Sequence, residues 1–185
     1  MKLVTGRTEI EDLDAFVGDL GAIGDEFDCV VQAFDADYVL GEDHLRTAVE
    51  RADRAFERGE NVARERAVEI LLYAAGRRQI DRALRMGVGE GETDVVVVVH
   101  SPDGDAQHER EAAEAVGDLL GPASASANTS DGASAHAGAD PLAADRIDAE
   151  EVRDFFDVND AELDATDATL ADLVRERVAL LDVEK

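Results

Sequence analysis

The order of apolar and polar residues along the chain predicts short strands that alternate with amphipathic helices. Five consecutive valines lie within residues 94–100, and they predict a central strand that is buried on both faces. Apolar residues also predict strands at 1–10 and 29–40. Helical spacing predicts helices at 11–20, 44–58, 62–75, 105–120 and 166–181, with a short helix that starts at Arg77. The expected breaks between these elements are glycines at positions 21, 24, 41, 59, 76 and 121.

This order of elements predicts an α/β fold in which helices pack on a mixed sheet. Its main helical parts are a helical hairpin region at 43–86 and an amphipathic helix at the C-terminal end. The apolar stripe of that last helix consists of Leu170, Leu173, Val174, Val178 and Leu181. Such a stripe can cap the core of the domain or provide a docking surface for a partner, and the sequence favours the core.

Residues 121–141 differ from the rest of the chain in composition. They consist almost entirely of Gly, Ala, Ser, Asp and Asn, and they show no apolar period. Such a segment cannot bury enough apolar surface to offset the entropy lost on ordering. We therefore expect a single domain over residues 1–185 with a disordered surface insertion at 121–141.

The 185-residue chain is strongly acidic, with 44 Asp and Glu against 18 Lys and Arg and a formal net charge of -26. The acids are spread along the whole chain, and only Lys2 and Lys185 are lysines. Self-repulsion destabilises such a domain unless salt screens it, so this composition is typical of a protein from a salt-accumulating halophile. An acidic tail for a basic partner would need a block of acids, and the sequence has none.

No constellation of residues predicts catalysis, a metal site or a cofactor. The histidines at 44, 100, 108 and 136 include no pair at helical ligand spacing and no HExxH motif. The single cysteine, Cys29, excludes an internal disulfide. No apolar run approaches the roughly 20 residues of a membrane helix, and the first residues lack the apolar core of a signal peptide. We therefore expect a soluble cytoplasmic protein, and no feature argues for an enzyme.

Residues 44–86, the basic segment, contrast with the acidity of the chain. They contain ten arginines and seven acids, a net charge of +3, whereas the other residues carry 8 bases and 37 acids. Uniform adaptation to salt would have removed bases here as well. Arg77 and Arg78 follow Gly76 at the predicted start of a helix, where free amides and the helix dipole favour an anion. Two guanidiniums at such a place suit a phosphate group.

Other residues of the basic segment could complete a nucleic-acid site. Arg58 and Asn61 flank a turn, Gln79 offers a donor and an acceptor to a base edge, and Tyr73 could stack on a base. The full candidate set is Arg58, Asn61, Arg64, Tyr73, Gly76, Arg77, Arg78 and Gln79. For Arg51, Arg54 and Arg82 we favour the simpler interpretation of a solvated helix face that pairs with nearby acids.

One string of residues is long and unusual in composition. It combines Asp37, Gly41, His44-Leu45, Ala55-Phe56, Gly59, Asn61, Glu69–Tyr73, Gly76 and Arg78–Ile80, and Val174–Asp182 adds a closing helix. These residues resemble the PRPK-binding-protein family, the smallest widely shared subunit of the KEOPS complex. The sequence departs from that family at Ala75, where a serine is usual, and at Arg77, where a lysine is common. The first change puts one hydroxyl contact in doubt, and the second preserves the charge.

The resemblance implies an α/β fold without catalytic activity or cofactor. It implies a subunit that binds the kinase-like ATPase and recruits tRNA through its single-stranded 3′ CCA end. The whole complex, with its threonylcarbamoyltransferase subunit, makes threonylcarbamoyladenosine. The resemblance also implies tRNA binding near Gly76–Gln79 and a kinase interface at the last helix. The alternative is a protein-only adaptor of the kinase that does not bind RNA.

Overall fold

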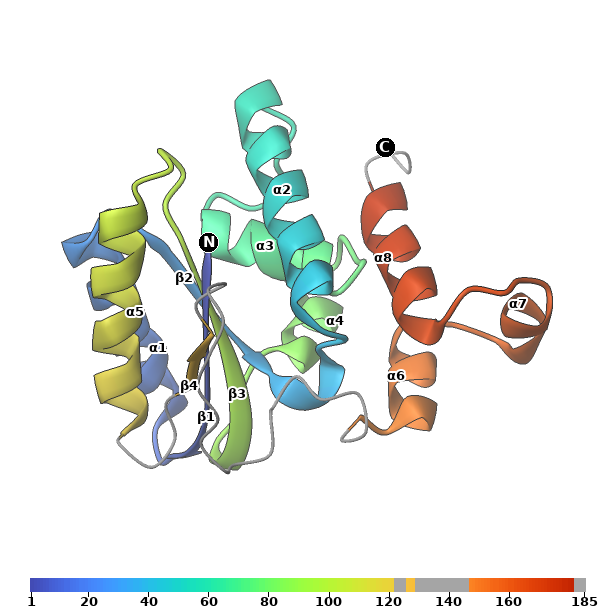
Figure 1. Cartoon of the computed structure of the whole chain (residues 1–185), viewed down its shortest axis with the longest axis horizontal. Coiled ribbons are helices and arrows are strands. Elements are labelled where there is room, and N and C mark those ends of the chain that lie inside the picture. Colours follow the sequence, from blue (N-terminus) through green and yellow to red (C-terminus); the bar gives the residue numbers. More distant parts are fainter. Residues whose placement is uncertain (122–125, 129–146, 182–185) are drawn as a thin grey trace. The chain divides into compact units, whose positions relative to one another are not determined.

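The computed structural model describes residues 1–121, 126–128 and 147–181. The chain divides into two compact units. The first unit comprises Met1–Ala36 and Gly87–Ala143, and the second comprises Asp37–Met86 and Ala144–Lys185. Figure 1 labels the helices and strands of both units.

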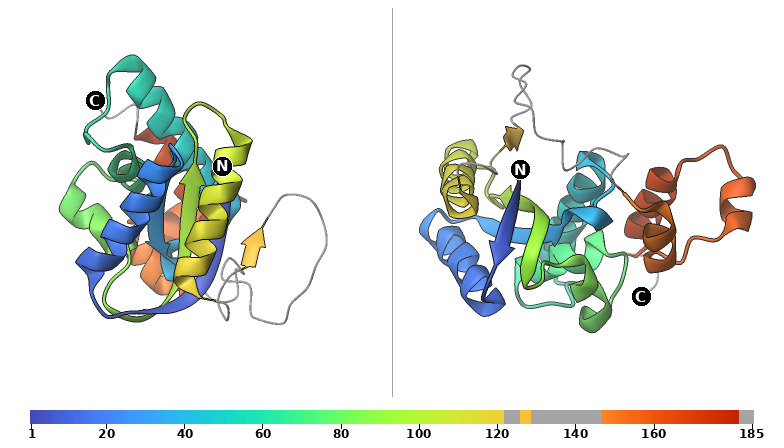
Figure 2. Two further views of the ribbon diagram at one scale, coloured as in Figure 1. Left: turned by 90° about the vertical axis from the view of Figure 1, so that its left-hand side faces the viewer. Right: turned by 90° about the horizontal axis from the view of Figure 1, so that it is seen from below.

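The first unit is built on an antiparallel sheet. Strands β1 (Lys2–Ile10), β2 (Val30–Asp35), β3 (Gly91–His100) and β4 (Ser126–Asn128) lie in the order β2-β3-β1-β4. The five valines of β3 are all 0% exposed, which confirms the prediction of a strand buried on both faces. Helices α1 (Leu13–Glu26) and α5 (Ala106–Leu120) cover the same face of the sheet in both views of Figure 2.

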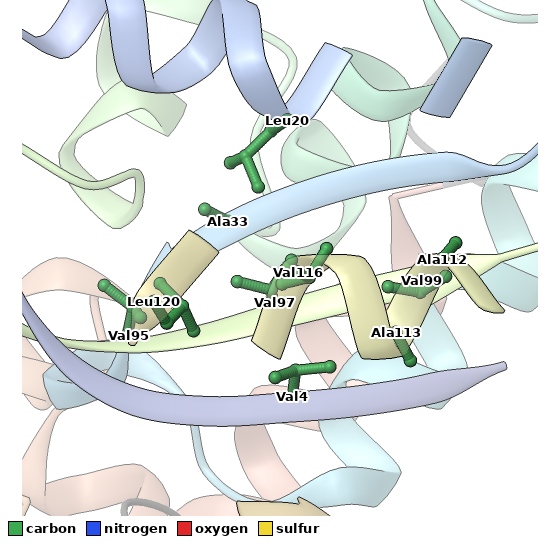
Figure 3. Close-up of a cluster of buried hydrophobic side chains, with 10 residues drawn as sticks. All are labelled: Val4, Leu20, Ala33, Val95, Val97, Val99, Ala112, Ala113, Val116 and Leu120. Atoms are coloured by element: carbon green, nitrogen blue, oxygen red, sulfur yellow. The ribbon is translucent and has the colours of Figure 1, made fainter. Parts of the chain in front are cut away.

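The core of this unit lies between the sheet and these two helices (Figure 3). Val4 and Ala33 face this core from β1 and β2, because the register pairs both of them with Val97 of the central strand. Leu20 of α1 and Val116 of α5 close the cluster from the helix side. Full burial of a Val or Leu side chain stabilises the fold by about 2 kcal/mol, so this cluster holds the layers together.

The α/β class is confirmed, but the strand pairings differ from the mixed sheet that the sequence predicted. The pairings among the four described strands are all antiparallel. β1 and β2 are joined through α1 and run in the same direction, as a helical crossover requires. β3 enters between them and runs opposite to both. β2 also ends earlier than predicted, because Ala36–Tyr38 form a 3-10 helix, η1.

Helix α1 extends six residues beyond its predicted end at Leu20, so the glycines that follow do not break it. Ile23 and Phe27 continue the apolar stripe at helical spacing and pack on the core, which outweighs the low helix propensity of glycine. Gly24 has a packing role instead. A Cβ added there would lie 2.7 Å from the carbonyl oxygen of Cys29, so the glycine allows α1 to approach the start of β2.

Strand β4 lies within the segment for which the sequence predicted disorder. Its residues pair with Leu3, Val4 and Thr5 and extend the sheet beyond β1. Ser126–Asn128 therefore depart from the disorder expected of 121–141, because their main-chain groups pair with the edge of β1. Gly121 ends α5. The other residues of the expected insertion lie outside the described part of the chain.

The second unit is helical, and its helix α2 (Glu42–Arg58) ends at Gly59 as predicted. The other elements are α3 (Arg66–Ala74), α4 (Ile80–Ala83), η2 (Leu84–Met86), α6 (Ala149–Phe155), α7 (Asp160–Asp164) and α8 (Leu170–Leu180). α2 packs against both α3 and α8. Val174 and Val178 are fully buried, so α8 belongs to the core of this unit, as the sequence favoured. Within the described residues, no helix has the length and apolar character that a bilayer span requires.

Candidate nucleic-acid and partner interface

The turn at Gly76 shapes the segment between α3 and α4. Gly76 has a φ of +59°. The N–H of Gly76 donates to the carbonyl of Tyr73, and the N–H of Arg77 donates to the carbonyl of Leu72, which together form a Schellman motif. A Cβ at position 76 would lie 3.5 Å from the Cβ of Arg177, so this turn packs directly against α8.

A buried histidine fixes the same end of α3. The backbone N–H of Leu40 donates to Nδ1 of His44 at 3.2 Å, and Nε2 lies 2.8 Å from the carbonyl oxygen of Ala74. Because Nδ1 accepts, Nε2 carries the proton and donates it, and the ring is neutral. Burial lowers the pKa of His44 to about 4, which keeps the ring neutral near pH 7. The end of α3 is therefore tied to the first turn of α2.

Arg77 directs its side chain toward the C-terminal part of the unit. Its guanidinium donates to the carbonyl oxygen of Phe155 and lies 3.1 Å from a carboxylate oxygen of Asp157. It also stands 5.2 Å from the centre of the Phe155 ring, which Arg85 approaches at 5.5 Å. Only 15% of the Arg77 side chain is exposed. Arg77 thus already pairs with an anionic group of its own chain, the carboxylate of Asp157.

Arg78 contacts the end of α8. Its guanidinium donates to the carbonyl oxygen of Leu181, which directly follows the last helical residue. The last carbonyl groups of a helix lack partners within the helix and carry the negative end of its dipole, so a guanidinium is favourable there. We call Arg77 and Arg78 the carbonyl-bound arginines, because they cap the C-terminal ends of α6 and α8.

The helix N-terminus expected at these two arginines is a wrong prediction. Helix α4 begins only at Ile80, has Gln79 as its N-cap residue and is four residues long. The carbonyl-bound arginines precede this helix and contact the C-terminal ends of two others. The Schellman turn explains the difference, because the chain leaves the α3 axis at Gly76 and helical hydrogen bonds resume only after the turn.

Tyr73 and Gln79 have opposite environments. The side chain of Tyr73 is 1% exposed, since α3 is buried on nearly all sides, and it offers no face on which a base could stack. This corrects the expectation for Tyr73. Gln79, by contrast, is exposed and remains a possible contact for a base edge.

The remaining candidates lie at the opposite end of α3. Arg58, Asn61 and Arg64 belong to the end of α2 and to the loop 59–65. Helix α3, which is nine residues and so about 13 Å long, lies between this loop and Gly76. The structure therefore divides the candidate set into two groups instead of bringing it together.

Arg58 and Arg64, the loop arginines, are exposed. Neither forms an ion pair with any acid in the described part of the chain. The side-chain amide of Asn61 donates to the carbonyl of Ala63 at 2.8 Å, so Asn61 helps to shape the loop. Arg82 is also exposed and has no acidic partner among the described residues, contrary to the pairing that we expected.

A carboxylate whose burial the sequence did not predict holds this loop in place. Glu69 is 2% exposed, and its Oε2 accepts the backbone N–H groups of Val62 at 3.0 Å and Ala63 at 2.7 Å. These two donors offset the loss of hydration that burial of the carboxylate causes. The sequence does contain a signal for it, because Glu69 is the one acid within the apolar stretch of α3.

The predicted partner-binding stripe of α8 is mostly internal. Val174, Val178 and Leu181 are buried within the second unit, whereas Leu170 and Leu173 are half-buried. Among the described residues of this unit, the large apolar side chains that are exposed are Val62, Ile80, Leu84 and Leu180. The apolar surface available to a partner therefore lies beside the predicted stripe rather than on it.

The described residues offer no site for metal or thiolate chemistry. Within the described ranges, no three His, Cys, Asp or Glu side chains gather as metal ligands would. Burial raises the pKa of the Cys29 thiol to about 11, with a smaller effect from nearby carboxylates. Cys29 is therefore a thiol, and a poor nucleophile, at neutral pH.

A family model described as Kinase binding protein CGI-121 matches residues 19–182. The match includes the loop arginines, the carbonyl-bound arginines and the whole of α8. A search of the curated proteins gave no match.

Proposed function

The chain belongs to the kinase binding protein CGI-121 family of non-catalytic KEOPS subunits, and we propose that it recruits tRNA to the complex by its single-stranded 3′ CCA end. The kinase-like ATPase is the direct protein partner. In the proposal this partner links the chain to the threonylcarbamoyltransferase subunit, while the basic segment holds the tRNA. The resemblance that the sequence carries to a KEOPS subunit agrees with this family.

The observation that carries the RNA proposal is the state of the loop arginines. In a chain with 44 acids and only 18 bases, an exposed arginine would be expected to pair, yet Arg58 and Arg64 have no acidic partner in the described ranges. Within the described part of the chain, no acid occupies the five guanidinium donors that each of them carries. Phosphate oxygens are the acceptors that match this fork of donors in bidentate geometry.

The carbonyl-bound arginines form the second part of the proposed interface. Their contacts with main-chain carbonyls and Asp157 use only some of their donors. Gln79 beside them is exposed and can read the edge of a base. An extended single strand then contacts the loop arginines at one end of α3 and this second group at the other.

The test is binding of labelled tRNA to the purified chain, followed by fluorescence anisotropy at several KCl concentrations. Intact tRNA should bind, and tRNA that lacks the terminal CCA should bind much more weakly. The variant Arg58→Gln/Arg64→Gln should reduce the slope of log affinity against log salt by about 1.4, because each phosphate contact with a single strand contributes about 0.7.

A matched control is Arg110→Gln, which removes an exposed arginine on α5, outside the basic segment. This variant should leave both the affinity and the salt slope nearly unchanged. Equal binding of intact and trimmed tRNA would refute recognition of the 3′ end. An equal loss in the Arg110 control would show that only the total charge matters.

For the kinase, we propose a docking surface made of Ile80, Leu84 and Leu180. These three side chains are exposed although they are large and apolar. Arg78 binds the carbonyl oxygen of Leu181, so the end of α8 meets the residues that precede α4. An apolar patch on adjoining elements is typical of a surface that a partner covers.

The second candidate is an adaptor that binds the kinase and no RNA. Two observations favour it: the ring of Tyr73 is buried, and the guanidiniums of Arg77 and Arg78 already have acceptors within the unit. An adaptor would be retained by the immobilised kinase subunit, but it would not shift tRNA either alone or together with the kinase. A tRNA shift by the chain alone would exclude it.

A further inference from the structure

Asp157 occupies a position where glycine is usual. Helix α6 ends in a Schellman motif, in which the N–H of Val158 donates to the carbonyl of Arg153 at 2.9 Å and the N–H of Asp157 to that of Asp154 at 3.4 Å. Asp157 is the left-handed residue of this motif, with a φ of +54°. L-residues adopt this conformation at a cost that glycine does not have, so the side chain of Asp157 calls for an explanation.

The contacts of Asp157 supply a reason for a carboxylate at this position. Its Oδ2 lies 3.1 Å from the guanidinium of Arg77, while 74% of its side chain is exposed. The guanidinium of Arg177 donates to its main-chain carbonyl at 3.1 Å and so fixes the backbone of the turn. The carboxylate thus meets Arg77 from a rigid backbone, but it can rotate into solvent without any movement of the main chain.

The neighbouring acids do not share this contact. Glu151 accepts a hydrogen bond from the hydroxyl of Tyr38, and Asp160 pairs with Arg153. Asp154 is exposed and has no ion-pair partner among the residues that the structure describes. Among the described residues 149–163, only Asp157 forms an ion pair with Arg77.

We propose that Asp157 is a built-in competitor for the phosphate that Arg77 binds, an inference that rests on the proposed tRNA function. Carboxylate and phosphate present the same kind of acceptor oxygen to a guanidinium, so the two compete for its free donors. RNA binds by displacing an exposed side chain that is free to rotate away. Asp157 therefore lowers the affinity for RNA and reduces the binding of unrelated anions.

The variant Asp157→Asn tests this competition with little risk to the fold. Asn has nearly the same shape, tolerates the left-handed conformation and lacks the charge. Asp154→Asn is the matched control, because it removes one charge from the same turn without touching Arg77. At physiological ionic strength, Asp157→Asn should bind intact tRNA about two- to fivefold more tightly than the control, as expected for the loss of one partly exposed ion pair.

The other outcomes separate this inference from the proposed function. An equal gain in tRNA affinity in both variants would show that the charge acts through its long-range field. That result would overturn the competition, whereas the proposed tRNA binding would stand. A gain that persists in Asp157→Asn/Arg77→Gln would overturn it as well. Weaker binding by Asp157→Asn would show that the carboxylate positions Arg77 and does not compete. If no variant binds tRNA, the proposed function fails and takes this inference with it.

Discussion

The Nε2 of His44 donates its proton to the carbonyl oxygen of Ala74, 2.8 Å away, and joins the first turn of α2 to the last turn of α3. The N–H of Leu40 donates to the other ring nitrogen. A second proton on Nδ1 would face this N–H group and place a charge in a fully buried site. Protonation would therefore remove the acceptor of the Leu40 N–H, and only the neutral ring makes both hydrogen bonds.

We expect this histidine to make stability depend on pH. The folded pKa of about 4 lies below the unfolded value of 6.5, so the unfolded chain binds more protons between them. The stabilisation of the folded state by neutral His44 is complete above pH 6.5 and is lost as the pH falls toward 4. In urea titrations, the free energy of unfolding should fall by about 2 kcal/mol between neutral pH and about pH 5 because of His44.

The matched variant for this measurement is His44→Gln. Its side-chain amide can still donate to the carbonyl of Ala74, but it does not titrate. The difference in unfolding free energy between wild type and variant should therefore narrow as the pH falls. If the two pH profiles run parallel, another group is responsible for the acid sensitivity.

Replacement of Glu69 should destabilise the second unit. Glu69→Ala leaves the N–H groups of Val62 and Ala63 without their acceptor, and each such loss costs about 1–3 kcal/mol. We expect the unfolding free energy to fall by about 2–4 kcal/mol in denaturant titrations. Glu57→Ala on the exposed face of α2 is the control and should change it by less than about 0.5 kcal/mol. A loss as small as that of the control would show that the loop finds other acceptors.

Replacement of two glycines of α1 by alanine should change the free energy of unfolding in opposite directions. Gly18 has open space around a new Cβ, so Gly18→Ala should stabilise the helix by about 0.5–1 kcal/mol. At Gly24 the new Cβ would lie 2.7 Å from a main-chain oxygen, and Gly24→Ala should destabilise by about 1–3 kcal/mol. Thermal unfolding of both variants measures the difference. Stabilisation by both would contradict the close approach at Gly24.

Substitution of an exposed apolar residue of α8 should weaken kinase binding, whereas substitution of a buried one should unfold the second unit. Leu180→Asp changes a side chain that is 46% exposed, so the fold should persist while the affinity for the kinase subunit falls at least about tenfold. Val178→Asp buries a charge in the core and should unfold the second unit. Calorimetric titration measures the affinity, and circular dichroism the fold.

The control for the docking surface is Val17→Asp, the same kind of change at an exposed position of α1. It should leave kinase binding intact. If Leu180→Asp binds as well as this control, the kinase contacts a different face of the chain.

Most elements of the fold were predictable, because their cause is local in the sequence. The apolar period gave β1, β3, α2 and α5 within a few residues of their ends. The end of α1 was predicted wrongly, because glycine propensity is a weak effect and the packing of Ile23 and Phe27 outweighs it. The direction of the strand pairings was also missed, since nothing in the pattern of β3 records which strands lie beside it.

Of the candidate site, the sequence predicted the concentration of positive charge but not the contacts of the individual side chains. Counting arginines located the basic segment, and the family match confirms the resemblance seen in the same residues. The acceptors of Arg77 and Arg78 lie 78 and 103 residues further along the chain, and such tertiary contacts leave no local pattern. Burial of Tyr73 was missed for a related reason, because a polar tip on an aromatic ring fits the core as well as the surface.

The length of α3 acts as a lower limit on the size of ligand that can use both groups of arginines. Its nine residues, about 13 Å along the helix axis, lie between the loop arginines and the carbonyl-bound arginines, and the buried contacts of His44 and Glu69 keep both ends from shifting. A free phosphate is much shorter than this helix, so we expect it to contact only one group at a time. In the proposed interface, a strand of several nucleotides reaches from one group to the other, so we expect it to bind polymer in preference to metabolite.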